Sequence, residues 1–229
     1  MKSRVIKICS VFAGIFIIIG MIVLVIDGYC FDRNFYVREY AQNKTTYVTG
    51  MSQEDLMDTT DVLLSYLRDK RDDLSVQHEV NGKMREVFNE REKAHMVDVK
   101  ALYLNARAIC YTLMAASLIF AAIALFVLKE KQSFLKGYML SNLVIIIIFA
   151  GLGIYAAADF YSFWTNFHHI FFTNDLWLLD MNTDILIMMV PEQFFFDLVM
   201  KIAITVVAAM AVLFGGAFFW SRRLRRKSA

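Results

Sequence analysis

The chain has 229 residues, is 58% hydrophobic with a single proline, and carries 24 Lys and Arg against 22 Asp and Glu, a formal net charge of +2. This composition and the positive mean hydropathy of +0.48 are those of a membrane protein. The near balance of charge gives no support to nucleic-acid binding.

Four apolar runs are each nearly free of charge and long enough to cross a bilayer, which takes about 20 residues in a helix. They cover residues 8–26, 108–128, 137–158 and 200–220, with longer outer stretches at residues 27–107 and 159–199. The sequence therefore predicts an α-helical membrane protein with four transmembrane helices and a small mixed α/β extracytoplasmic domain between spans one and two.

The charge next to the spans predicts their orientation, because cytoplasmic segments of membrane proteins carry an excess of Lys and Arg. The start of the chain, the link at residues 129–136 and the tail at residues 221–229 together hold eleven cations against the single acid Glu130. Residues 159–199 hold six acids and no Lys or Arg. We expect both termini in the cytoplasm and both longer stretches on the outer face of the cell membrane.

The first span, within residues 1–26, also has the basic start of a signal peptide, but no small-residue cleavage site follows it. Cys30 comes after residues 27–29, Asp-Gly-Tyr, which do not resemble a lipoprotein cleavage box. We therefore expect a retained anchor. Cys9 and Cys110 lie inside predicted spans and Cys30 stands alone outside, so the cysteines give no disulfide framework.

The outer region at residues 27–107 begins with a segment, residues 32–49, that is rich in Tyr, Phe, Val and Thr and is predicted to be extended. Ser52 followed by Asp55 is typical of a helix N-cap with its third-position acid. Leucines at helical spacing then predict a helix that ends at about residue 69.

A hairpin is predicted next, because its turn at residues 81–82 is Asn-Gly, which favours the two-residue turns of antiparallel strands. The flanking strands are expected within residues 74–80 and 83–87. This pairing sets His78 opposite Arg85, where we expect a structural role for the histidine.

The second outer segment, residues 159–199, has eleven aromatic residues between positions 160 and 196 and is too apolar for a solvated loop. We expect it to fold back onto the bilayer surface or to dip into it, covered by protein or facing a wet cavity. Pro191 is well placed at the first turn of the helix that becomes the fourth span.

A helical pattern from about residue 90 continues into the second span, so His95 is expected above the membrane near the lipid headgroups. Glu92 and Asp98 stand three residues before and after His95, so the three side chains can share a helix face. A carboxylate beside an imidazole can fix its tautomer and raise its basicity. The pattern indicates a catalytic histidine, or a solvated helix with ordinary charge pairs.

The Glu92-x-x-His95 pair is also found in di-iron helix bundles, but those need a second such pair and further glutamates on other helices. The sequence has no second copy and no zinc-ligand spacing. We therefore predict neither a metal site nor a cofactor.

Residues 163–177 place His168, His169 and Asn166 among aromatic side chains just after the third span. Aromatic residues are expected at a membrane interface, whereas two histidines and an asparagine among them are less expected. No serine elbow or phosphate loop is present, and Cys110 lies inside a span, where it is a poor nucleophile. If the protein is an enzyme, histidine acid–base chemistry on a substrate that brings its own nucleophile remains.

Three groups of residues resemble the outer parts of one known family. The first is Met51, Ser52, Asp55, Leu56, Tyr66 and Leu67; the second is Phe88 with Glu92, His95, Met96, Asp98, Val99 and Lys100, matching E-x-x-H-M-x-D-V-K; the third is Phe167, His168, Ile170, Phe171, Phe172, Asn174, Trp177, Asp184, Pro191, Phe194 and Phe195. With four spans in matching order, the chain resembles the lipoprotein intramolecular transacylases, known as Lit, of low-GC Gram-positive bacteria.

This resemblance implies a membrane acyltransferase whose substrate is a diacylglyceryl lipoprotein. The family moves the sn-2 acyl chain to the α-amino group of the N-terminal cysteine, which gives a lyso-form lipoprotein. By match of motif, His95 and His168 would be the catalytic histidines. Glu92, Asp98, Asn166 and Trp177 would support them or bind substrate, and His169 is not carried over.

Other function classes fit the residues taken without the resemblance. A membrane sensor or assembly protein with a ligand-binding outer domain would tolerate substitution of the histidines. A lipid hydrolase would release free fatty acid. A transporter is disfavoured, because the spans hold no paired internal charges and no Gly or Pro breaks at mid-depth. Oligomeric state stays open.

Overall fold

The computed structural model describes residues 2–228, and the chain divides into two compact units. One unit consists of Met1–Gly28, Arg107–Ala158 and Met200–Ala229, and the other of Tyr29–Ala106 and Asp159–Val199. Since the second unit contains both stretches predicted to lie outside the membrane, residues that are far apart in sequence fold there into a single body.

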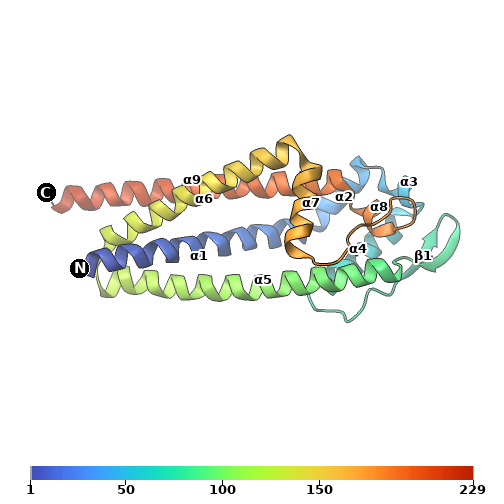
Figure 1. Ribbon diagram of the computed structural model, residues 1–229, viewed down its shortest axis with the longest axis horizontal. Coiled ribbons are helices and arrows are strands. Elements are labelled where there is room, and N and C mark those ends of the chain that lie inside the picture. The colour runs from blue at the N-terminus through green and yellow to red at the C-terminus, as the bar shows by residue number, and fades with distance from the viewer. Residues whose placement is uncertain (1, 229) are drawn as a thin grey trace. The chain divides into compact units, whose positions relative to one another are not determined.

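The first unit contains four long helices, which Figure 1 labels. They are α1 (Lys2–Cys30), α5 (Glu90–Ala122) with the π-helical turn η1 (Ile123–Val127), α6 (Lys131–Ala158) and α9 (Glu192–Ser228). Each contains one of the predicted apolar runs, and within the described residues these four are long and apolar enough to cross a membrane. The prediction of four membrane helices is thus confirmed by length and composition.

Apolar side chains form both the inside and the outside of this four-helix unit. The buried core draws on every helix and includes Ile18, Ala124, Tyr138, Val206 and Met210. Other large apolar side chains point outward, and their exposed fractions reach 70% and more, as at Phe126, Ile154 and Val212. A helix that is apolar all round is typical of a membrane span, where hydrocarbon covers the outward side chains.

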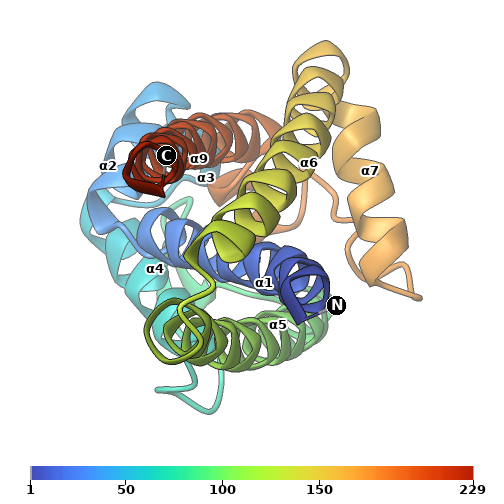
Figure 2. The ribbon, with the colours of Figure 1, turned by 90° about the vertical axis from the view of Figure 1, so that its left-hand side faces the viewer.

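Helices α1 and α6 approach one another closely where small residues face each other. A Cβ atom on Gly14 would lie 2.0 Å from Ser141 Oγ, and one on Gly137 would lie 2.6 Å from the Lys7 carbonyl oxygen. Figure 2 shows α6 inclined across α1. Glycine and serine permit this approach, as in other membrane helix pairs that pack on small residues.

Hydrogen bonds join the basic segments of this unit. The hydroxyl oxygens of Ser3 and Ser133 are 2.7 Å apart, and the Gln132 side chain donates to the Ser221 carbonyl at 2.7 Å. In Figure 1, α1 starts, α6 starts and α9 ends at one end of the unit. The three predicted cationic segments therefore lie together.

The second unit is mostly helical. Its elements are α2 (Arg33–Gln42), α3 (Thr45–Thr49), α4 (Gln53–Leu67), strands β1 (Gln77–Val80) and β2 (Lys83–Glu86), α7 (Phe160–Phe171), α8 (Ile185–Met189), and the first turns of α5 and α9. The two strands pair antiparallel as an isolated hairpin.

The prediction of an extended segment at residues 32–49 is wrong, because this segment forms α2 and α3. Asp32 caps α2 by accepting a hydrogen bond from the Asn34 N–H at 3.0 Å. The buried residues of α2 are spaced as on one helix face: Phe35, Tyr36, Glu39 and Tyr40. Aromatic residues favour strands mainly through packing, so a buried helix face satisfies them equally well.

The other local predictions in this unit are confirmed. Ser52 caps α4 by accepting from the Asp55 N–H at 3.1 Å. The turn residues Asn81 and Gly82 have the positive φ values of 52° and 77° that a two-residue hairpin turn needs. The helix from residue 90 continues without a break through α5.

His78 pairs across the hairpin with Arg85, as the register predicts. Its two ring nitrogens each lie 2.9 Å from a carboxylate oxygen of α4, one of Asp55 and one of Asp58. These contacts attach the hairpin to α4, which agrees with the structural role expected for this histidine.

Candidate active site

His95 lies in the second turn of α5, and the start of this helix is fixed by a reciprocal pair of hydrogen bonds. The Asn89 side-chain oxygen accepts from the Glu92 N–H at 3.1 Å, and Glu92 Oε2 accepts from the Asn89 N–H at 2.7 Å. Two backbone donors that a helix start leaves unpaired are satisfied in this way, as in a capping box. The position of the turn that carries His95 is set as a result.

Glu92 also binds a segment far away in the sequence. Its other oxygen, Oε1, accepts from the backbone N–H of Leu186, in α8, at 2.6 Å, and the glutamate is fully buried. Burial raises the pKa of Glu92, while the two backbone N–H donors act in the opposite direction. Among the described residues Glu92 makes no hydrogen bond to His95. Its effect on the candidate site is to hold the backbone at Asn89 and Leu186 in place.

Asp184, just before α8, joins the same network. It accepts from the Asn89 side-chain amide at 2.8 Å and from the Asp180 backbone N–H at 2.8 Å. Burial opposes ionisation of Asp184, but the hydrogen bonds from Asp180, Thr183 and Asn89 outweigh it and lower the pKa. Two buried carboxylates thus tie the loop that follows α7 to the start of α5.

The structure brings together the two histidines that the motifs single out, His95 of α5 and His168 of α7. Their ring centroids are 6.2 Å apart with 34° between the ring planes. Both side chains are buried, with exposed fractions of 8% and 7%. The two rings come from the two separate chain segments that make up one compact unit, and they meet inside it.

Aromatic rings surround this histidine pair. Phe172 contacts both histidines, with centroid distances of 5.4 Å to His95 and 5.7 Å to His168. Trp164 meets the His168 ring edge-on at 5.0 Å, and Trp177 stacks on it at 4.7 Å. This apolar lining limits the access of water and strengthens electrostatic interactions inside the site.

Burial among these rings lowers the pKa of both histidines and so favours the neutral form of each. His95 precedes the apolar run at residues 108–128, and burial lowers its pKa to about 4, with His168 acting in the same direction and Asp98 opposing. Burial also lowers the pKa of His168, against the raising effect of its hydrogen bond to the Trp164 carbonyl. A neutral imidazole has one nitrogen free to accept a proton and one N–H to donate.

One hydrogen bond fixes which nitrogen of His168 carries the proton. Nδ1 of this ring lies 2.7 Å from the backbone carbonyl oxygen of Trp164, one helical turn earlier in α7. A carbonyl oxygen only accepts, so Nδ1 is the donor and the neutral ring keeps its proton there. Nε2 of His168 is therefore the nitrogen that can accept a proton.

Of the other residues predicted to support the histidines or bind substrate, some lie in the site and some lie around it. Trp177 lies in the site, and its indole N–H is buried without a hydrogen-bond partner among the described residues. Asp98 instead accepts from the Asn174 side chain at 2.9 Å, and Asn166 is exposed on α7. His169 is exposed, and its ring contacts Trp177 edge-on at 5.1 Å.

Some site residues were missed by sequence reasoning although the sequence contains a signal for them. Asn89 is three residues before Glu92, a capping-box spacing. Trp164 and Phe172 lie four residues before and after His168, positions that share its helix face. The acceptor on Trp164 is a backbone carbonyl, however, which no residue type identifies.

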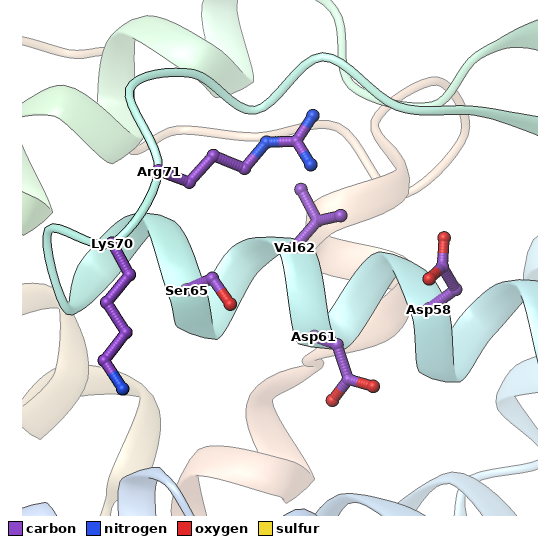
Figure 3. A pocket seen from close by; sticks show the side chains of 6 residues that line it. All are labelled: Asp58, Asp61, Val62, Ser65, Lys70 and Arg71. Atoms are coloured by element: carbon purple, nitrogen blue, oxygen red, sulfur yellow. The ribbon is translucent and has the colours of Figure 1, made fainter.

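A separate shallow pocket of about 400 Å³ lies on α4 and the loop that follows it. Figure 3 shows Asp58, Asp61, Val62 and Ser65 on the helix, with Lys70 and Arg71 on the loop. Neither histidine of the pair lines it. Within residues 2–228 no group of His, Cys, Asp and Glu is placed to hold a metal ion.

Comparison with known proteins identifies the family. The sequence model described as "Lipoprotein intramolecular transacylase Lit" matches residues 11–195. The membrane integral lipoprotein intramolecular transacylase Lit from Bacillus cereus, solved in meso, is 22% identical, with a TM-score of 0.76 over 99% of this chain and 98% of that chain.

Two variants of the Bacillus cereus protein, in which one histidine is replaced by arginine or alanine, have TM-scores of 0.72 and 0.70. Both are 21% identical; the comparisons cover 100% and 99% of this chain, and 95% of each of those chains. No curated protein matches the sequence. Because the family match spans most of the chain, this protein belongs to the lipoprotein intramolecular transacylase (Lit) family.

Proposed function

We propose that this protein transfers the sn-2 acyl chain of a diacylglyceryl lipoprotein to the α-amino group of the lipoprotein's N-terminal cysteine. The product is a lyso-form lipoprotein that is N-acylated and S-monoacylglyceryl-modified. The observation that carries the proposal is the buried pair of histidines, His95 and His168, in a member of the Lit family. The motif resemblance named the same two residues.

The chemistry of this transfer suits a histidine pair. The attacking amine must lose a proton as the N–C bond forms, and the departing glyceryl oxygen must gain one, so a group that both accepts and donates protons is required. The tetrahedral intermediate also needs a donor for its oxyanion. Because amine and ester belong to one molecule, positioning them can supply roughly 7–11 kcal/mol of the barrier reduction.

We further propose that the second unit lies on the extracytoplasmic face and that both termini are cytoplasmic. The gathering of three cationic segments at one end of the membrane unit supports this orientation, through the excess of Lys and Arg in cytoplasmic segments. Helices α2 to α4 and the hairpin would then form the outer domain between the first two spans, and α7 would complete it.

Contact of α7 with lipid fits the same arrangement. Its exposed apolar side chains include Tyr161, Ile170 and Phe171, with exposed fractions of 68%, 75% and 50%. An amphipathic helix of this kind can lie in the membrane interface, with its apolar face toward the acyl chains. The acyl donor would then reach the histidines directly from the bilayer.

Lipoproteins from a host with and without this gene test the proposal. N-terminal lipoprotein peptides should be lyso-form only in the host that expresses the protein, as read by tandem mass spectrometry. Replacement of His95 or His168 by Asn should leave folded protein in the membrane but no lyso-form, whereas the matched change His169→Asn should keep it.

Three results would contradict the proposal in different ways. Normal lyso-form product from both the His95→Asn and His168→Asn proteins would overturn the site. Release of free fatty acid without N-acylation would indicate a lipid hydrolase. No change in any lipoprotein would favour a sensor or assembly protein with a ligand-binding outer domain.

A further inference from the structure

We propose that the indole N–H of Trp177 binds substrate, by donating a hydrogen bond to a carbonyl oxygen of the lipidated cysteine. This inference rests on the proposed acyl transfer and adds a third residue to its site. It stands on the burial of this N–H beside His168, and on the way α5 holds the turn that carries Trp177. We call residues 174–178 the Trp177 turn.

The N–H of Trp177 is a buried donor that the fold leaves unused. Its nitrogen, Nε1, has no hydrogen-bond partner among the described residues. An indole N–H can only donate, so it needs an acceptor when it is removed from water. Buried polar groups without a partner are few in folded proteins, because each loses its hydrogen bonds to water without replacement. A donor kept in this state can serve an acceptor that arrives with a ligand.

The position of the ring puts this donor in the candidate site. The Trp177 ring stacks on His168, with ring centroids 4.7 Å apart and 26° between the planes. His168 in turn lies 6.2 Å from His95. The acyl chains of a diacylglyceryl lipoprotein offer no hydrogen-bond acceptor, whereas its two esters and its first peptide bond each offer a carbonyl oxygen. A carbonyl oxygen at the reacting end of the substrate is therefore the matching acceptor.

The Trp177 turn is shaped by its own hydrogen bonds. The backbone N–H of Leu178 donates to the Asp175 carbonyl at 3.2 Å, which closes the turn around Trp177. The side-chain oxygen of Asn174 accepts from the Leu176 N–H at 3.0 Å. The backbone that carries the indole is thus held in one conformation by neighbouring residues.

Two side chains of α5 hold the Trp177 turn in place. Asp98 accepts from the Asn174 side-chain amide at 2.9 Å, and the Arg91 guanidinium donates to the Asp175 carbonyl. Arg91 stands four residues before His95 and Asp98 three residues after it, so the three side chains share one face of the helix. The helix that carries His95 therefore also sets the position of the turn, which makes Arg91 and Asp98 positioning residues for Trp177.

A purely structural Trp177 would be distinguishable from a substrate-binding one. Its stacking on His168 and its edge-on contact with His169 at 5.1 Å need the aromatic ring but not the N–H. An aromatic side chain of the same shape without the N–H should then replace it without loss. A substrate-binding Trp177 should lose its function when the N–H alone is removed.

Two variants remove the donor and keep an aromatic ring. One is Trp177→Phe; the other carries β-(3-benzothienyl)alanine at position 177, which keeps two fused rings and has sulfur in place of the N–H. Both should lose about 10²–10³-fold in kcat if the acceptor is the ester carbonyl under attack, where negative charge develops. Both should instead raise KM about 10-fold at unchanged kcat if the acceptor is a carbonyl that does not react.

The assay is the rate of amide formation by the full-length protein in liposomes with a synthetic diacylglyceryl lipopeptide. Trp220→Phe, in the unit of four membrane helices, is the matched control and should change neither constant. Full activity of both Trp177 variants would overturn the inference. A loss in Trp177→Phe that the benzothienyl side chain restores would overturn it as well, because the shape of the ring would then be what matters. Inactivity of the unmodified protein would instead mean that the proposed function itself fails.

Substitutions of Asp98 test the positioning role. Asp98→Ala and Asp98→Asn both remove a negative charge that acts on His95, but only asparagine keeps an oxygen that can accept from Asn174. Asp98→Ala should lose about 10-fold in rate, the effect of one lost hydrogen bond, and Asp98→Asn should keep most of the rate. Equal losses in the two variants would overturn the positioning role of Asp98.

A spectroscopic measurement reports on the N–H itself. Ultraviolet resonance Raman spectra contain an indole band that responds to hydrogen bonding of the N–H, and the difference between the unmodified protein and Trp177→Phe isolates the band of Trp177. The probe is a diacylglyceryl lipopeptide whose α-amino group is acetylated, so that it cannot react. Added at concentrations that inhibit transfer, it should shift the band toward the hydrogen-bonded position. An unchanged band would overturn the inference even if acyl transfer is observed.

Discussion

Glu92 and Leu186 are 94 positions apart in the sequence, yet the backbone N–H of Leu186 donates to the Glu92 carboxylate at 2.6 Å. The same carboxylate accepts from the Asn89 N–H, so it joins the start of the helix that carries His95 to the short helix α8. The buried glutamate is thereby a positioning residue for the candidate site.

Glu92→Ala is expected to destabilise the protein strongly. The change leaves two buried backbone N–H groups without acceptors, and each such group costs about 1–3 kcal/mol. Glu92→Gln should cost less, because its amide oxygen can still accept from one of them. Thermal unfolding in detergent measures the effect, with Glu90→Gln on the exposed side of the same turn as control. Equal stability of the Ala variant and the control would contradict this role.

Protein stability is expected to fall as the pH is lowered from about 6.5 toward 4, in part through His95. The pKa of His95 is about 4 in the fold and 6.5 as the ordinary value, so in this window the unfolded chain binds a proton that the folded site refuses. This contribution is complete above pH 6.5 and is at most about 3 kcal/mol.

The His95→Asn variant isolates that contribution, since asparagine does not titrate. The unmodified protein and His95→Asn should differ in unfolding temperature at neutral pH. This difference should shrink as the pH drops from 7 to 4. Parallel curves over that range would mean that His95 is not held neutral by burial.

Gly137→Ala is expected to weaken the membrane unit, because the new Cβ would lie 2.6 Å from the Lys7 carbonyl oxygen and 2.6 Å from Ser10 Cβ. Overpacking of this kind costs about 1–3 kcal/mol. Gly151, in the same helix, has nothing within 4 Å of its Cβ position, so Gly151→Ala is the control. A lower unfolding temperature is predicted for Gly137→Ala alone, and equal values would contradict the close packing.

His78→Ala is expected to loosen the hairpin without changing acyl transfer. The histidine contacts Asp55 and Asp58 at hydrogen-bond distance, and hydrogen bonds of this kind contribute about 1 kcal/mol each. Amide hydrogen exchange of β1 and β2 should become faster while the rate of transfer stays the same. A loss of transfer with unchanged exchange would instead connect the hairpin to the site.

Local signals in the sequence predicted much of this architecture. The four apolar runs, the Ser52 cap, the register of the Asn81–Gly82 hairpin and the unbroken α5 each depend on neighbouring residues only. The segment at residues 32–49 depends instead on packing, since α2 buries Phe35 and Tyr36 against Phe194 from a distant part of the unit. Strand propensity could not reveal that partner.

The candidate site also has some features that the sequence predicts and others that only the fold reveals. Motif resemblance selected His95 and His168, and the structure brings these rings together. The sequence also suggested that Glu92 acts on His95 directly, but its carboxylate is taken up by two backbone N–H groups. Backbone donors and acceptors, such as Leu186 N–H and the Trp164 carbonyl, are the same in every residue type and become visible only in the fold.

The most direct test of the proposed function uses the purified protein in liposomes with a diacylglyceryl lipopeptide. Because transfer within one molecule conserves all atoms, the intact mass of the lipopeptide should stay constant while its α-amino group stops reacting with amine reagents. Fragmentation should then locate one acyl chain on the cysteine nitrogen. Loss of one acyl chain in mass, or an α-amino group that stays reactive, would contradict intramolecular acyl transfer.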